Sequence, residues 1–178
     1  MDKKIVSAIW IYPVKSLGGI QLPKAKVLPK GLAHDRRWML VDEQNQCMTQ
    51  RVYPTMALFK LSLDAHSFSI RYENEAMDLP FTYDPDYSPA IVWNDVVNVH
   101  EVSNTHSEWF SDKLGIKCRL VAFPEKNPRP VDPLYAINNE HVGLADGYPL
   151  LVIGQRSLDD LNERLKDPLP MNRFRPNI

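Results

Sequence analysis

Cysteine is scarce in this sequence. The 178 residues include two cysteines, Cys47 and Cys118, which excludes a small scaffold built on disulfides. Neither cysteine belongs to a CxxC pair, so we expect no zinc or iron–sulfur site formed by this chain alone. Low cysteine content without a disulfide framework is typical of a reducing compartment, and we expect a cytoplasmic protein.

Long hydrophobic runs and an excess of one charge are also missing. No apolar stretch approaches the ~20 residues that a membrane helix needs. The first residues, MDKKIVSAIW, lack the apolar stretch and small-residue cleavage site of a secretory signal. The formal net charge of −1 gives no basic footprint for unspecific nucleic-acid binding. We therefore expect neither a membrane nor a nucleic acid as partner.

Glycine is rare, whereas proline is abundant: 7 glycines stand against 15 prolines. Proline has no backbone N–H to donate, so this content disfavours a helical bundle and favours short strands and turns. The chain length fits one domain, or one domain plus part of a second.

Runs of valine, isoleucine and aromatic residues predict a mainly β fold up to about residue 123. Turn residues recur about every ten residues, among them the segment 64–66 with His66, and this spacing favours an antiparallel sandwich or barrel. The expected strands are 5–12, 21–28, 38–42, 47–50, 57–63, 67–72, 90–93, 96–102 and 118–123.

Two helices form the minor helical component. Ser107 is a plausible N-cap for the first, and Gly115 stands where a C-terminal glycine belongs. After a predicted strand at 148–153, Ser157 opens the second helix, which ends before Pro168. The segment 124–133 holds four prolines and is the candidate domain boundary, either as a free linker or as a loop that wraps the barrel.

No catalytic arrangement stands out in the sequence. The five histidines show neither HxxxH nor HxH spacing, and no GxSxG motif is present, so we predict no metal ligands and no catalytic residues. Cations do gather near predicted strand ends, and they suit an anionic small molecule. From the residues alone, a solvated lysine, a local Asp–Arg pair and a basic surface turn are the simpler explanations, and we favour them before any resemblance is considered. The cationic groups are Lys15 with Ser16, Arg36 with Arg37, Arg51, and Arg173 with Arg175 and Asn177.

Five motifs, taken in order, resemble the MOSC superfamily, named for the C-terminal domain of molybdenum cofactor sulfurase. They are YPVKS (12–16), GLAHDRRWMLVDE (31–43), TQRVYPTMAL (49–58), DGYPLLVIGQRSLDDLNERL (146–165) and NRFRPNI (172–178). The most similar subgroup is the bacterial relatives of the mitochondrial amidoxime-reducing component. The resemblance implies a MOSC N-terminal β-barrel domain at 1–123, a proline-rich linker at 124–133, and the first part of a truncated MOSC β-barrel at 134–178.

The resemblance also implies a site for molybdenum cofactor, a molybdopterin with a terminal phosphate. Lys15, Ser16 and Arg36 match family residues that hold this phosphate. Arg175 and Asn177 match residues that contact the pterin, and the segment that approaches the pterin in relatives corresponds here to Gln155, Arg156 and Ser157.

The function that follows is a reductase of N-hydroxylated compounds, a small-molecule substrate class. Its electrons would come from a donor protein or from an appended iron–sulfur domain. Family reductases ligate molybdenum with a cysteine beyond the RFRPNI motif, a position this sequence does not contain. We therefore expect this chain alone to be inactive and to retain no cofactor. A non-catalytic binding module, or a carrier of sulfur or cofactor, is the alternative.

Overall fold

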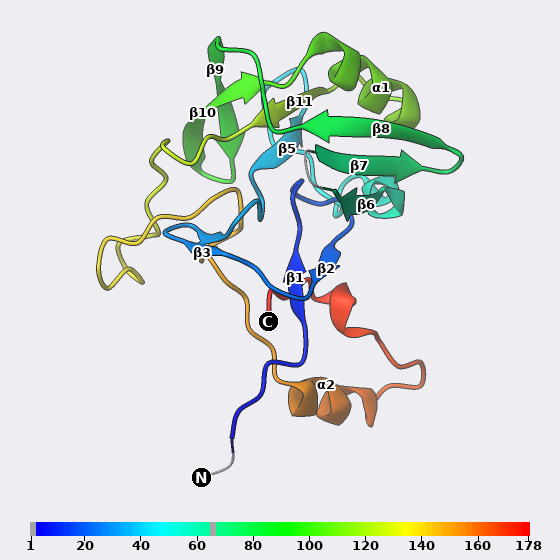
Figure 1. Ribbon diagram of the computed structural model, residues 1–178, viewed down its shortest axis with the longest axis vertical. Helices are drawn as coiled ribbons and strands as arrows, with labels where there is room; N and C mark the ends of the chain where they lie inside the picture. Colours follow the sequence, from blue (N-terminus) through cyan, green and yellow to red (C-terminus); the bar gives the residue numbers. More distant parts are fainter. Residues whose placement is uncertain (1–2, 65–66) are drawn as a thin grey trace.

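The computed structural model describes residues 3–64 and 67–178. It is mainly β, as predicted, and its strands form small antiparallel sheets that curl around a shared core (Figure 1). The strands are β1 Ile9–Ile11, β2 Ile20–Leu22, β3 Val27–Leu28, β4 Gly31–Leu32, β5 Trp38–Val41, β6 Lys60–Leu63, β7 Ser67–Tyr72, β8 Glu75–Pro80, β9 Tyr87–Val92, β10 Asp95–Glu101 and β11 Arg119–Ala122. The helices are α1 Asn104–Leu114 and α2 Gln155–Asn162, with 3-10 turns at η1 Pro54–Leu58 and η2 Met171–Arg173.

The sheet β5-β11-β10-β9 is buried on both faces. Side chains alternate along a strand, so Trp38 and Leu40 of β5 enter the main core while Met39 and Val41 enter a second core on the opposite face. Leu144, from the C-terminal part of the chain, belongs to this second core and is fully buried. The C-terminal segment is therefore packed onto the barrel sheet and covers part of it.

The proline-rich segment, residues 124–133, packs against the region formed by strands β1–β11, which we call the barrel. The buried ammonium of Lys30 donates to the carbonyl oxygens of Pro124, Glu125 and Asn127. Arg37 Nε also donates to Glu125 Oε2 at 2.7 Å. Because proline-rich backbone has few partners of its own, these two cations fix a segment that could otherwise detach.

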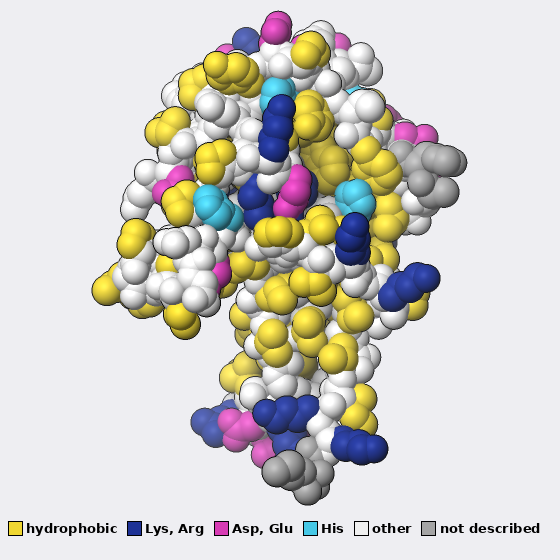
Figure 2. All heavy atoms as spheres, turned by 60° about the vertical axis from the view of Figure 1, so that its left-hand side comes forward, with side chains coloured by type: hydrophobic (Ala, Val, Ile, Leu, Met, Phe, Trp, Pro, Cys, Tyr) yellow, Lys and Arg dark blue, Asp and Glu magenta, His cyan; other side chains and the backbone are white. Residues whose placement is uncertain are grey.

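Beyond this segment the chain forms a loop whose apolar side chains Leu134 and Ile137 are exposed. Figure 2 shows hydrophobic side chains spread among polar ones over the face it presents, with basic side chains at the narrow lower end. None of the helices in the described ranges combines the length and apolar composition required to cross a bilayer.

The last residues of the sequence lie beside the first strand, as Figure 1 shows. Trp10 N donates to Asn177 O at 2.8 Å, and Asn177 N donates to Leu151 O at 2.7 Å. Ile153 N donates to Ile178 O at 2.9 Å. The strand predicted at 148–153 is wrong: the backbone there is bonded to residues 177 and 178, yet it forms no regular ladder.

Both helix starts differ from the sequence predictions. Ser103 caps α1, since its hydroxyl accepts from His106 N, and Ser107 lies inside the helix with its hydroxyl donating to Glu101 Oε1. The predicted C-terminal glycine, Gly115, is confirmed by its φ of 65°. Helix α2 begins at Gln155 after Gly154, two residues before the predicted cap Ser157.

Three strand predictions also need correction, and one strand was missed. The strand predicted at 21–28 is interrupted, since β2 ends at Leu22 and β3 begins at Val27. Residues 47–50 form no strand and contact β5 through single bonds, such as Met48 N to Leu40 O at 2.8 Å. The first part of 57–63 belongs to the 3-10 turn η1, which Pro54 begins. Strand β8 was not predicted, because EAMDLP has few β-branched residues. The turn predicted at His66 lies outside the described residues.

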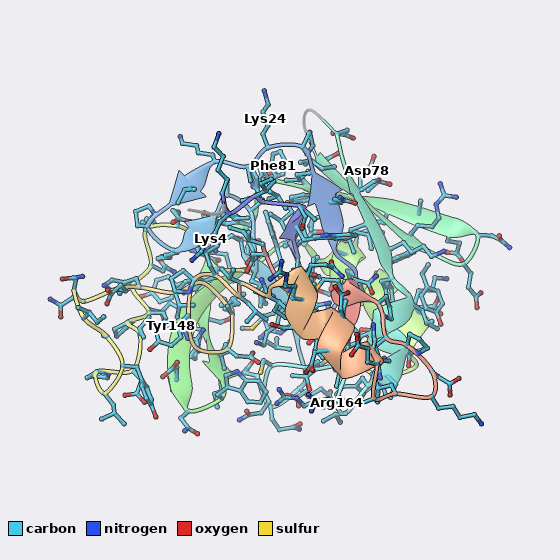
Figure 3. All side chains as sticks on the ribbon, turned by 90° about the horizontal axis from the view of Figure 1, so that it is seen from below. Lys4, Lys24, Asp78, Phe81, Tyr148 and Arg164 are labelled. Atoms are coloured by element: carbon cyan, nitrogen blue, oxygen red, sulfur yellow. The ribbon has the colours of Figure 1, made fainter. Side chains whose placement is uncertain are left out.

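We predict that Lys30→Met lowers the free energy of unfolding by about 2 kcal/mol, because it leaves buried carbonyl oxygens without a donor. Urea unfolding followed by circular dichroism measures the change. Lys24→Met is the matched control, since Lys24 projects from the surface (Figure 3) and should alter stability little. Equal stability of the two variants would contradict the role assigned to Lys30.

Candidate functional site

A cavity of about 510 Å³ lies between the barrel and the C-terminal segment. Its walls come from the loops after β1 and β4, from residues 49–51, from the β9–β10 turn, and from residues 145–151 and 173–177. One acidic side chain, Asp146, faces five cationic ones among the lining residues. The cations are Lys15, Arg36, Arg51, Arg173 and Arg175.

Lys15 is held at the back of the cavity. Its backbone N donates to Trp38 O at 2.7 Å, which ties the loop after β1 to β5. Its ammonium donates to Leu144 O at 2.8 Å and to Asp146 Oδ1 at 2.7 Å. Burial lowers the pKa of Lys15, which shows that the charge is kept in the protein at a cost. An ammonium has three donors, so one remains beyond these two contacts.

The ring of Tyr12 supports two guanidinium groups. Arg36 lies 4.7 Å and Arg175 lies 4.2 Å from its centroid. Asp35, which is 2% exposed, accepts from Tyr12 N at 2.7 Å and from Arg36 Nη1 at 2.6 Å. Arg175 Nη1 donates to Leu17 O at 2.5 Å. Cation–π contacts and one buried carboxylate thus hold two like charges near each other.

Arg175 has an unused donor. Its Nη2 is buried and has no hydrogen-bond partner among the described residues. Burial, and after it the charge of Arg36, lower the pKa of Arg175 to about 10. A buried guanidinium nitrogen without an acceptor is costly.

Three of the predicted site residues have left-handed backbone conformations. The φ angles are 65° at Ser16, 50° at Arg36 and 57° at Arg175. Residues with a Cβ rarely adopt such angles, and they cluster at functional sites when they occur. Within the described ranges the hydroxyl of Ser16 makes no hydrogen bond with another residue, so it can donate to a ligand in the cavity.

Asn177 lines the cavity, but its side chain mainly links three separate segments of the chain by hydrogen bonds. Its side chain donates to Trp10 O at 3.0 Å and accepts from Leu151 N at 3.1 Å and from Arg36 Nη1 at 3.3 Å. It is 1% exposed. Its amide oxygen and nitrogen therefore already have partners in the protein.

The structure thus brings Lys15, Ser16, Arg36, Arg175 and Asn177 to one cavity. The other predicted residues lie elsewhere. Residues 155–157 form the exposed first turn of α2 and are not among the lining residues.

Among the lining residues that the sequence reasoning missed, Asp146 and Trp93 make the polar contacts described next. Asp146 begins an Asp-Gly pair, and Trp93 sits with φ 57° at the turn between β9 and β10. Trp93 Nε1 donates to Asp146 Oδ1 at 3.2 Å, and its ring is flanked by Lys15 at 5.2 Å and Arg51 at 5.1 Å. The available signal was an aromatic residue in a turn, where a large apolar side chain has no core to fill.

Metal-ligand geometry is a separate question from anion binding. Across residues 3–64 and 67–178, no group of three or more histidine, cysteine or acidic side chains is arranged to hold a metal ion. Neither Cys47 nor Cys118 lines the cavity. Burial raises the pKa of the Cys118 thiol, which makes it a weak nucleophile and metal ligand.

Comparison with known proteins places the chain in a family. The family model of the MOSC N-terminal beta barrel domain matches residues 3–117, and that of the MOSC domain matches residues 139–178. The mitochondrial amidoxime-reducing component 1 of Mus musculus is 31% identical over 97% of this chain and 54% of its own length. The component 2 protein of Rattus norvegicus is 29% identical over 97% of this chain and 55% of its own length.

A molybdenum cofactor sulfurase of Pyricularia oryzae is 27% identical over 97% of this chain and 28% of its own length. The chain therefore spans about half the length of the amidoxime-reducing relatives, and less of the sulfurase. The first family model alone covers well over half of the chain, and the second follows it in the same order. The chain belongs to the MOSC superfamily.

Proposed function

We propose that the cavity binds the phosphate end of molybdenum cofactor in the whole protein. The observation that carries this proposal is the cavity lining, in which five cationic side chains face a single carboxylate. The names of the relatives support the choice of cofactor, since one of them is a molybdenum cofactor sulfurase.

The donors available in the cavity fit a phosphate group. Lys15 has a third N–H, and Ser16 has a hydroxyl without a hydrogen-bond partner among the described residues. Phosphate oxygens accept several charge-assisted hydrogen bonds at once, and such bonds are about twice as strong as neutral ones. Arg36 adds a second guanidinium on the same tyrosine ring.

Other residues hold these donors in place. Asp35 fixes Arg36, and Asn177 joins the chain end that carries Arg175 to β1. Contacts of Arg175 and Asn177 with the pterin, and an approach of residues 155–157 to it, stay predictions. The exposed position of α2 leaves residues 155–157 accessible.

We propose that the whole protein reduces N-hydroxylated small molecules. The similarity to two amidoxime-reducing components supports this activity. When bound, the cofactor supplies two-electron redox chemistry, and the residues described here bind and orient it. Electrons would come from a donor protein or an appended iron–sulfur domain. We place the boundary between the two domains in residues 124–133, which lie in the gap between the two family models.

The alternative is a binding module or a carrier of sulfur or cofactor. It is favoured by the absence of a cysteine from the cavity lining in the described part of the chain, because no thiolate of these residues reaches the cavity to ligate a metal. Purified whole protein that reduces an amidoxime with a chemical electron donor supports the reductase. Bound cofactor that is released to another enzyme, without reduction, supports the carrier.

We expect Lys15→Ala and Arg36→Ala to weaken retention of the cofactor in the whole protein. Each removes a charge-assisted contact worth about 1.5–3 kcal/mol. Molybdenum content after purification from cofactor-competent cells measures the effect. Arg164→Ala is the control, because Arg164 is exposed on the surface beside α2 and pairs with Asp160. Wild-type molybdenum content in both cavity variants would refute the phosphate site.

Ser16→Gly separates strain from binding. Glycine adopts a φ of 65° without the strain of about 1–2 kcal/mol that a Cβ causes. Because glycine also raises the entropy of the unfolded chain by about 0.5–1 kcal/mol, we expect a net gain in stability of about 0.5–1 kcal/mol. Loss of the hydroxyl should weaken binding of inorganic phosphate by about fivefold. Glu73→Gly is matched, since exposed Glu73 has a φ of 51° at the β7–β8 turn. It should gain stability and bind phosphate like the unmodified chain.

A further inference from the structure

Asp146 is the one carboxylate among the residues that line the cavity. Oδ1 accepts from Lys15 Nζ at 2.7 Å and from Trp93 Nε1 at 3.2 Å. Oδ2 lies 3.7 Å from Arg51 Nη2. The carboxylate thus occupies, with its own negative charge, donors that would otherwise face an anionic ligand.

Asp146 is not the sole partner of the Lys15 ammonium. The Lys15 ammonium is also bound to Leu144 O, and that stretch of backbone is fixed independently. Arg129, which is 4% exposed, donates from Nη1 to Gly143 O and to Ala145 O, both at 2.7 Å. Leu144 N donates to Arg36 O at 2.8 Å. The carbonyl groups of Gly143 and Ala145 and the backbone N–H of Leu144 are therefore anchored, up to the residue before Asp146.

The chain beyond this anchor is less constrained. The side chain of Asp146 is 62% exposed, although its partner Lys15 is buried. It is followed by Gly147, around which a Cβ would meet nothing within 4 Å. A carboxylate on such a segment can turn away from Lys15 into solvent without moving the anchored backbone.

We propose that Asp146 is an intramolecular competitor for the anion in this cavity. It neutralises Lys15 while the cavity holds no anion, and an incoming phosphate must displace it to reach the ammonium. This inference rests on the proposed function, because it concerns the same cavity. Asp146 therefore lowers the affinity of the cavity for an anion. When the carboxylate is displaced, the indole N–H of Trp93 also loses its acceptor.

The test is a calorimetric titration of this chain with inorganic phosphate. Asp146→Asn retains one side-chain oxygen as an acceptor but removes the negative charge. We expect this variant to bind phosphate about tenfold more tightly than the unmodified chain. Asp160→Asn is the matched control: Asp160 is also 62% exposed and ion-paired, but lies on α2 outside the cavity. It should change affinity less than about twofold, because exposed distant charges are screened.

A second measurement needs no change at Asp146. In the nitrogen-15-labelled chain, the indole N–H signal of Trp93, identified with Trp93→Phe, should move progressively as phosphate is added. The indole signal of Trp38, whose ring lies in the main core, should stay in place. A Trp93 signal that does not move while phosphate binds would overturn the displacement.

The outcomes separate the two proposals. If the unmodified chain binds phosphate, Lys15→Ala abolishes that binding, and Asp146→Asn binds no more tightly, the cavity is an anion site and the competitor role is wrong. Weaker binding by Asp146→Asn would likewise overturn the role and make Asp146 an aid to Lys15. If neither the unmodified chain nor Asp146→Asn binds phosphate, both the proposed anion site and the proposed competitor role are wrong.

Discussion

Mutual repulsion among the cations around one cavity is the constraint on which the site depends. Like charges this close destabilise a fold unless each is held by acceptors or aromatic faces. Here Lys15 is held by a carbonyl and a carboxylate, and Arg36 and Arg175 share the Tyr12 ring. Among the described residues around the cavity, the Arg175 Nη2, the Tyr12 hydroxyl and the Ser16 hydroxyl have no hydrogen-bond partner.

Cations also hold the backbone that surrounds the cavity. Lys30, Arg37 and Arg129 are buried and bind carbonyl oxygens or carboxylates of segments that have few strand or helix bonds of their own. Burying a lysine or arginine without hydrogen-bond acceptors is costly, so each of these side chains stabilises the fold only when its acceptors are in place. The same residue type therefore serves two purposes: some cations fix the polypeptide, and others face the cavity.

The strands of β5 and β7 were predictable because alternation and β-branched residues are local signals. The N-cap of α1 was not predictable, because both Ser103 and Ser107 are residues that favour an N-cap. Only the hydrogen bond from His106 N to the Ser103 hydroxyl identifies Ser103 as the cap. For the site, motifs identified Lys15, Arg36 and Arg175. They could not identify Asp146, because a carboxylate beside a glycine resembles an ordinary solvated turn until its distant partners are known.

The contact between Trp10 and Asn177 joins the two ends of the sequence. During synthesis the ribosome releases the barrel strands first, and they can pair while the later residues are still being added. At that stage Lys15 lacks its contacts with Leu144 and Asp146, and the ring of Tyr12 lacks its contact with Arg175. The cavity is thus complete only when residues 144–177 have docked against the strands that carry Lys15 and Tyr12.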